Sequence, residues 1–207
     1  MAVVRKHIAV AGLACASALV AAQTVAQAVD FWAYDLRIAS LDSNTDASMF
    51  HWVAGAALLA IAASFALLAR RRGRQRRILL ALAAIFALLF VDNRTDLHHR
   101  VAHGTALLLP LLAVGFVLLL EVSRIAPPQA CLLLRAGVAS LALSLVIHLL
   151  GPPLLHAIGW SQGDWPYQIK VAFKQGTELG GWLLVAFGAL AFVVAQPTTG
   201  TRSSTVR

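Results

Sequence analysis

Six long apolar stretches constrain the fold of this chain more than any other feature of its sequence. They cover approximately residues 8–29, 50–69, 78–92, 103–121, 131–150 and 178–195. A helix of about 20 apolar residues can cross the hydrocarbon core of a bilayer. Charged residues make up only 13% of the chain, against about a quarter in soluble domains. We therefore predict an all-α polytopic transmembrane helix bundle of six spans in a single domain, residues 1–196. A cytoplasmic tail, residues 197–207, is predicted to be disordered.

The first apolar stretch allows a second interpretation. Basic residues precede it, and Ala26-Gln27-Ala28 lies near its end, which is the order found in a secretory signal peptide with an A-x-A cleavage site. Its apolar run is longer than the corresponding region of most signal peptides, and this length favours a retained helix. Cleavage would leave five spans. Both interpretations place the following loop on the outer side.

Arginine and lysine set the predicted orientation, because short cytoplasmic loops carry an excess of both. Residues 70–77 read RRRGRQRR and connect the second and third spans, so we predict that this loop and both termini are cytoplasmic. Eight of the nine acidic residues and all five tryptophans then fall at the outer side, where an aromatic belt is expected. Topology thereby accounts for the net charge of +8, and no nucleic-acid partner is expected. The alanine-rich spans favour a bacterial inner membrane.

The segment VDNRTDLHHRVAHG, residues 91–104, concentrates ionisable side chains at the predicted outer edge of the bundle. His99 and His103 are four residues apart, so a helix would place both imidazoles on one face, where they can share a metal ion. Asp96 lies one turn earlier and could orient an imidazole or act as a third ligand. The alternative is a solvated interfacial loop whose histidines and aspartates pair with arginines and lipid headgroups.

Two further residues could complete a metal site from other helices, namely His148 near the outer end of the fifth span and Glu178 at the start of the sixth. A divalent ion such as zinc held there would polarise a water molecule for hydrolysis of a lipid substrate, with Glu178 or Asp92 as the proton-transfer group. The alternative for Glu178 is a carboxylate at a helix start, favoured by the helix dipole and paired with Lys174 one turn before it.

His51 and His148 support a third interpretation. Two histidines on different helices near one face of a membrane can ligate a b-type haem between those helices. Such a protein would transfer electrons, or would use Glu178 in proton-coupled transport. The many polar neighbours argue against haem, because haem pockets in helix bundles are mostly apolar.

Asp92, the pair His98-His99 and the segment KQGTELGG at residues 174–181 together carry a resemblance to a known group. They are similar to uncharacterised bacterial polytopic membrane proteins in which an aspartate precedes a His-Glu pair by this interval and a glutamate-containing turn opens the last span. Here His99 replaces that glutamate, and Gln175 stands where the pattern often has another. Imidazole in place of carboxylate implies a softer metal. The resemblance implies a shared outer site without naming its chemistry.

The favoured functional prediction is an integral membrane protein that serves as an accessory or structural component, in contact with the lipid bilayer and with a membrane-protein partner. A metal-dependent hydrolase and a haem-binding or proton-coupled transport component are the alternatives.

Overall fold

The computed structural model describes residues 2–42, 47–95, 97, 104–161 and 163–196, and this part of the chain is helical without any strand. Its six helices are each long and apolar enough to cross a membrane. They are α1 (Ala2–Tyr34), α2 (Met49–Arg71), α3 (Arg76–Thr95), α5 (Gly104–Ile125), α6 (Pro128–Ala157) and α7 (Trp165–Val194). The predicted all-α bundle of six apolar helices is confirmed. The predicted disordered tail, residues 197–207, lies outside the described residues.

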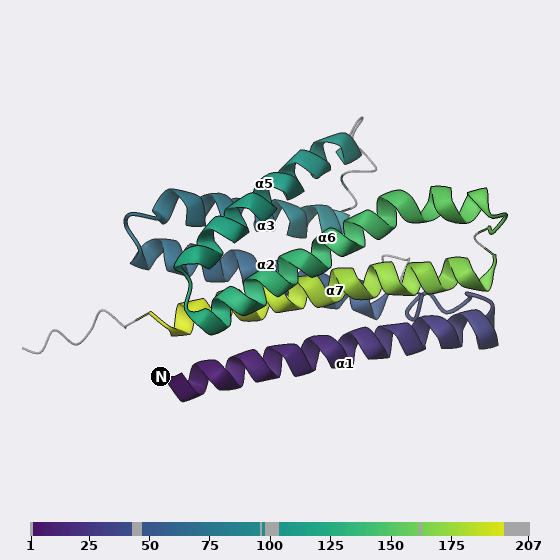
Figure 1. Cartoon of the computed structure of the whole chain (residues 1–207), viewed down its shortest axis with the longest axis horizontal. Coiled ribbons are helices and arrows are strands. Elements are labelled where there is room, and N and C mark those ends of the chain that lie inside the picture. Colours follow the sequence, from purple (N-terminus) through teal and green to yellow (C-terminus); the bar gives the residue numbers. More distant parts are fainter. Residues whose placement is uncertain (1, 43–46, 96, 98–103, 162, 197–207) are drawn as a thin grey trace, which may run out of the picture.

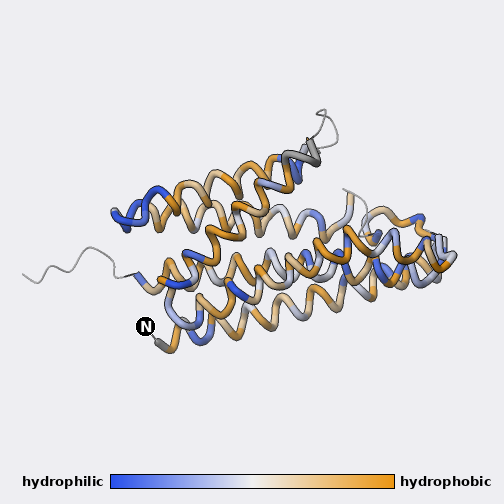
Figure 2. The backbone as a smooth tube through the Cα atoms, turned by 45° about the horizontal axis from the view of Figure 1, so that its top comes forward, coloured by the Kyte–Doolittle hydropathy of each residue, from blue (hydrophilic) through white to orange (hydrophobic). Residues whose placement is uncertain are grey.

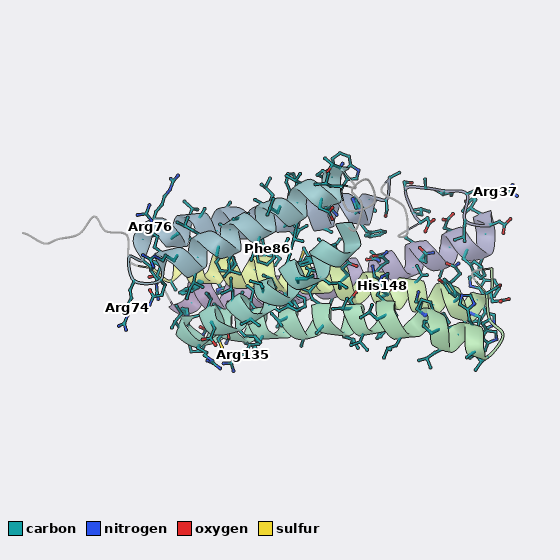
Figure 3. All side chains as sticks on the ribbon, turned by 90° about the horizontal axis from the view of Figure 1, so that it is seen from above. Arg37, Arg74, Arg76, Phe86, Arg135 and His148 are labelled. Carbon is teal, nitrogen blue, oxygen red and sulfur yellow. The ribbon has the colours of Figure 1, made fainter. Side chains whose placement is uncertain are left out.

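The helices run approximately alongside one another, and the arginine-rich connection between α2 and α3 lies at one end of the bundle (Figures 1 and 2). We call this the basic end, which carries Arg74, Arg76 and Arg135 (Figure 3). The first described turn of α1 and the last turn of α7 both lie there. Charged side chains can stay hydrated at a helix end, whereas the interior of a bilayer excludes them.

Helix α7 occupies the centre of the bundle and packs against α1, α2 and α6. Its apolar core includes Trp182, whose indole ring lies 6.0 Å from the ring of Phe86 on α3 in an edge-to-face arrangement. Phe86 in turn stacks on Phe65 of α2, with ring centroids 6.2 Å apart. The three aromatic side chains are buried and connect α2, α3 and α7.

The contact between α6 and α7 is close enough to require glycine. A Cβ atom at Gly137 would lie 2.6 Å from Val185 Cγ2, and one at Gly181 would lie 2.6 Å from Leu141 Cγ. Small residues let helix backbones approach closely, and such contacts stabilise helix pairs in membranes, where lipid competes with any apolar surface. This approach fixes which side chains of α6 and α7 meet.

All six described helices are longer than the predicted spans, and the difference is largest for α1, α6 and α7. Helix α6 continues through Gly151-Pro152-Pro153 to Ala157, beyond residue 150, where the fifth span was predicted to end. The two prolines remove only their own N–H donors, and the carbonyl groups that they free lie close to the end of the helix, where water can reach them. Helix α7 begins at Trp165 rather than at Glu178.

Helices α1, α6 and α7 contain 33, 30 and 30 residues, whereas α2, α3 and α5 contain 23, 20 and 22. The longer three reach further at the end opposite the basic end (Figure 1). We call their protruding parts the extension, made of residues 24–34, 149–157 and 165–173.

Candidate functional site

Polar side chains lie where α2 begins and α3 ends, and on α6 and α7 next to the extension. We call this set the polar layer, and its described members include His51, Asn93, His148, Lys174 and Glu178. All lie on helices that are apolar over most of their length, so each of these groups has to find a polar partner or remain in contact with water.

His51 is held by a residue of the neighbouring helix. Its Nε2 lies 2.6 Å from the backbone oxygen of Asn93, and the side-chain amide of Asn93 lies 3.4 Å from His51 Nδ1. A carbonyl oxygen only accepts hydrogen bonds, so Nε2 donates and Nδ1 accepts from the amide. Both ring nitrogens are therefore engaged between α2 and α3, and a haem iron could bind His51 only by displacing one of these contacts.

Arg94 lies beside this pair and covers an aromatic ring. Its guanidinium carbon is 3.4 Å from the ring centroid of Trp52, a cation–π contact between α3 and α2. Within the described residues, its Nη1 is buried without a hydrogen-bond partner, and so is Oδ1 of Asn93. Asp92, a predicted proton-transfer residue, is half-buried in the last turn of α3.

Glu178 forms an ion pair one helical turn from its partner. Lys174 Nζ lies 2.6 Å from Glu178 Oε2, and the two side chains are 21% and 36% exposed. This pairing was one of the two predictions for Glu178 and is confirmed. The predicted position at a helix start was wrong, because α7 begins at Trp165 and Glu178 lies well inside it. The dipole at a helix terminus therefore does not account for this carboxylate.

His148 is exposed on α6 and lies within reach of the charges on Lys170, Lys174 and Glu178 of α7. The aliphatic part of Lys170 packs closely over Gly151, where a Cβ atom would lie 2.9 Å from Lys170 Cε. Two ammonium groups and one carboxylate of α7 thus act electrostatically on the imidazole. Such an environment opposes a divalent cation beside His148, because both lysines repel it.

Two serines of α6 join the polar layer to the helix contact below it. The hydroxyl of Ser140 donates to the carbonyl oxygen of Thr177 at 2.6 Å, and that of Ser144 donates to the carbonyl oxygen of Lys174 at 3.0 Å. These bonds hold α6 and α7 in one register. The sequence analysis did not identify them, although serines four residues apart on an apolar helix are a recognisable signal of interhelical hydrogen bonding.

Helix α1 contributes polar groups that the sequence analysis also missed. Gln23, Gln27 and Asp30 are almost completely buried. Gln27 Nε2 donates to Oε1 of Gln168 on α7 at 3.1 Å, and Asp30 Oδ1 accepts from the backbone N–H of Ile38 at 2.9 Å. The spacing of the three residues places them on one helical face, which could have predicted this contact. The Ala-Gln-Ala segment proposed for signal cleavage lies inside α1, with its glutamine bound to α7.

The predicted metal ligands Asp96, His99 and His103, together with His98, lie outside the described residues. The two-histidine metal site therefore stays a prediction. Within the residues that the structure does describe, no group of three or more histidine, cysteine, aspartate or glutamate side chains could hold a metal ion.

The comparisons with known proteins identify a family. Residues 8–193 match the family model described as Domain of unknown function (DUF8692). This match extends from the first turns of α1 to the end of α7. No curated protein and no solved structure matches the chain. Because the match covers most of the sequence, the protein belongs to the DUF8692 family.

Proposed function

We propose that this integral membrane protein is an accessory component of a bacterial inner membrane, with its basic end and both termini in the cytoplasm, and that its extension binds another membrane protein. The observation that carries this proposal is the extension itself. The 30 residues of α6 rise about 45 Å at about 1.5 Å per residue, whereas the hydrocarbon core of a bilayer is about 30 Å thick. About 15 Å of this helix therefore reach beyond the hydrocarbon core on the outer side if the helix stands upright.

The part of α6 in the extension presents an apolar stripe. Leu150 and Leu154 are four residues apart on α6, and they are 56% and 64% exposed. Side chains at this spacing lie along one helical face. Large apolar patches exposed outside the hydrocarbon core are typical of protein–protein contacts. A partner helix with an apolar face would cover this stripe, as helices in membranes pack through close van der Waals contact.

The contacts of the polar layer support a structural role for its ionisable groups. Glu178 binds Lys174 within α7, and His51 binds Asn93 between α2 and α3. The polar layer thereby stabilises the helices that support the extension. An accessory protein requires this kind of fixed surface, whereas a catalytic base has to be accessible to a substrate.

Photo-crosslinking from single positions tests the proposal. The photoreactive residue p-benzoylphenylalanine is placed at Leu154 and, as a matched control, at Leu132, which lies on the same helix near the basic end and is 62% exposed. Irradiation of intact cells of the source organism should give one discrete protein adduct from position 154 and only lipid adducts from position 132. The adduct partner is identified by mass spectrometry and confirmed by reciprocal crosslinking.

A second variant gives the test a clear negative outcome. With the crosslinker at Leu150, the additional change Leu154→Asp should abolish the adduct while the amount of folded protein in the membrane stays the same. If positions 150 and 154 label only lipid, as the control does, the extension does not bind a protein and the proposal is refuted.

Two measurements on the purified protein distinguish this function from the two alternatives. The metal-dependent hydrolase requires about one zinc, manganese or iron ion per chain, measured by elemental mass spectrometry without a histidine tag and lost in the variant His99→Ala with His103→Ala. The haem alternative requires a Soret band that disappears in His148→Ala. The accessory function requires neither and tolerates these changes.

A further inference from the structure

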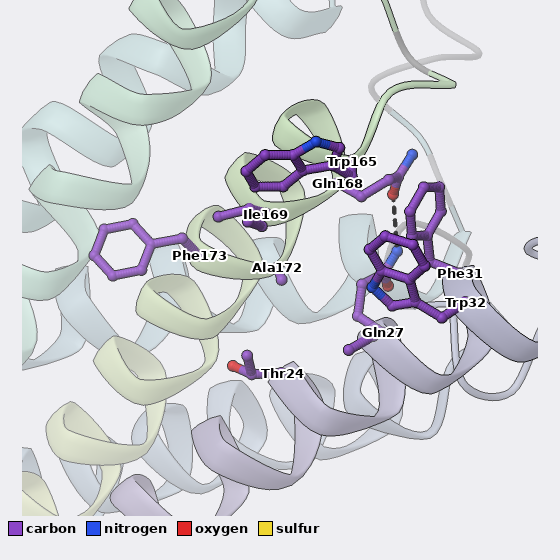
Figure 4. A pocket seen from close by; sticks show the side chains of 10 residues that line it. Thr24, Gln27, Phe31, Trp32, Trp165, Gln168, Ile169, Ala172 and Phe173 are labelled. Atoms are coloured by element: carbon purple, nitrogen blue, oxygen red, sulfur yellow. Dashed lines mark hydrogen bonds between the residues drawn. The ribbon is translucent and has the colours of Figure 1, made fainter.

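A pocket of about 190 Å³ lies between α1 and α7 in the extension (Figure 4). Aromatic and aliphatic side chains form most of its wall, and two carboxamides and one hydroxyl are its polar groups. The residues that line it are Thr24, Gln27, Ala28, Phe31, Trp32, Trp165, Gln168, Ile169, Ala172 and Phe173. We propose that this pocket binds one alkyl chain of a phospholipid from the outer leaflet. The proposal is independent of the partner protein on α6.

The position of the pocket connects it to the lipid surface. Ile169 and Phe173 line the side of the pocket nearer the start of the extension. Each is more than half exposed, and both lie on a helix that is long and apolar enough to cross a membrane. Thr24 and Phe173 lie at the start of the extension, and Trp32 and Trp165 lie nearer its tip. A chain that leaves the hydrocarbon core between α1 and α7 therefore meets a mostly apolar wall.

The size of the pocket favours a single chain. Pockets for drug-sized ligands measure about 300–1,000 Å³, which is larger than the 190 Å³ available here. The two indole rings, of Trp32 and Trp165, add broad apolar faces to the wall of the pocket near the tip of the extension.

The polar groups of the pocket make hydrogen bonds within the protein. Gln27 and Gln168 bind each other through the hydrogen bond of 3.1 Å (Figure 4). The hydroxyl of Thr24 donates to the carbonyl oxygen of Val20 within α1. With these donors used inside the protein, the pocket can accept an alkyl chain without leaving those bonds broken.

A phospholipid with a diazirine group in the middle of one acyl chain tests the proposal. The full chain is reconstituted in vesicles of phosphatidylethanolamine and phosphatidylglycerol that contain this lipid, irradiated, and digested for peptide mass spectrometry. Labelling of Trp165, Ile169 and Phe173 should exceed that of Leu132 severalfold, although Leu132 is at least as exposed as each of them. Equal labelling per exposed side chain would mean that the chain meets only bulk lipid and would refute the proposal.

Two adjacent positions on α1 provide a matched pair of variants. Ala28 lines the pocket, and Val29 is exposed beside it without lining it. Ala28→Trp fills the pocket and should reduce labelling of Ile169 to the level of Leu132, whereas Val29→Trp should leave labelling unchanged. Unchanged labelling in Ala28→Trp would overturn the proposal. The comparison within the unaltered protein decides the question even if Ala28→Trp does not fold.

Discussion

Gly181→Ala is the substitution for which the structure gives the most direct expectation. The added methyl group would lie 2.6 Å from Cγ of Leu141 and 3.1 Å from the carbonyl oxygen of Gly137. The leucine side chain has other rotamers available, but the carbonyl oxygen belongs to the backbone of α6. It can move away only if α6 and α7 separate, and their separation would also stretch the hydrogen bond from Ser140 to the carbonyl of Thr177.

The size of the effect follows from two opposing terms. Alanine favours a helix over glycine by about 1 kcal/mol, and an extra methylene in a well-packed contact costs about 1–3 kcal/mol. Gly115→Ala provides the control, because its Cβ would meet only Ile85 Cγ2 at an ordinary contact distance of 3.4 Å. Both variants gain the helix propensity, so the difference between their free energies of unfolding measures the packing cost. We expect Gly181→Ala to be less stable than Gly115→Ala by about 1–3 kcal/mol.

Unfolding of both variants and of the unaltered protein is measured in mixed micelles by titration with dodecyl sulfate, with helical circular dichroism as the signal. If Gly181→Ala is as stable as Gly115→Ala, the contact between α6 and α7 is not as close as described. The inference that glycine sets the register of this helix pair would then fail.

Three further changes test the polar contacts. Glu178→Gln should destabilise the protein by about 1 kcal/mol because it leaves the partly buried ammonium of Lys174 without its partner. A double-mutant cycle with Lys174→Met measures the coupling energy between the two side chains. Additive effects of the two changes would contradict the ion pair. Gln27→Leu should cost about 0.6–1.7 kcal/mol in the same unfolding assay, and no loss would show that its buried hydrogen bond does not hold α1. The backbone N–H of Ser161, and then its hydroxyl, lower the pKa of Asp164 below 3.8, so these bonds stabilise the turn above that pH and are lost as the pH falls through the lowered pKa. Carboxyl carbon resonances should show this low midpoint and a rise in Ser161→Ala; a midpoint at 3.8 in the unaltered protein would contradict the bonding.

The pairing of Lys174 with Glu178 could be predicted because it is local. Residues four apart on a helix are neighbours whatever the rest of the protein does. The hydrogen bond between Gln27 and Gln168 joins residues that are 141 positions apart, and no property of either segment alone specifies its partner. The sequence indicated only that α1 carries polar residues on one face.

The helix boundaries show a different limit of the sequence analysis. Residues 160–173 mix aromatic, polar and basic side chains, and they precede the last apolar stretch, which was predicted to begin at residue 178. Most of them instead belong to α7, where Gln168 and Ala172, four residues apart, are buried while Ile169 and Phe173 face outwards. Mean hydropathy averages over both faces of a helix. It therefore underestimates the length of a helix that includes a segment with only one buried face.

The sequence by itself determined the class of this protein, its six apolar helices and the concentration of arginine at one end. Hydropathy and charge are properties of each segment, and lipid requires every spanning segment to satisfy its own backbone hydrogen bonds, which leaves the helix as the solution for each stretch. Only the tertiary structure decided that α7 lies at the centre, that Gly137 and Gly181 bring α6 against it, and that three helices extend beyond the others. These features depend on contacts between segments distant in the chain. Many registers of two apolar helices bury a similar amount of apolar surface, and a single Cβ atom or hydroxyl group selects one of them.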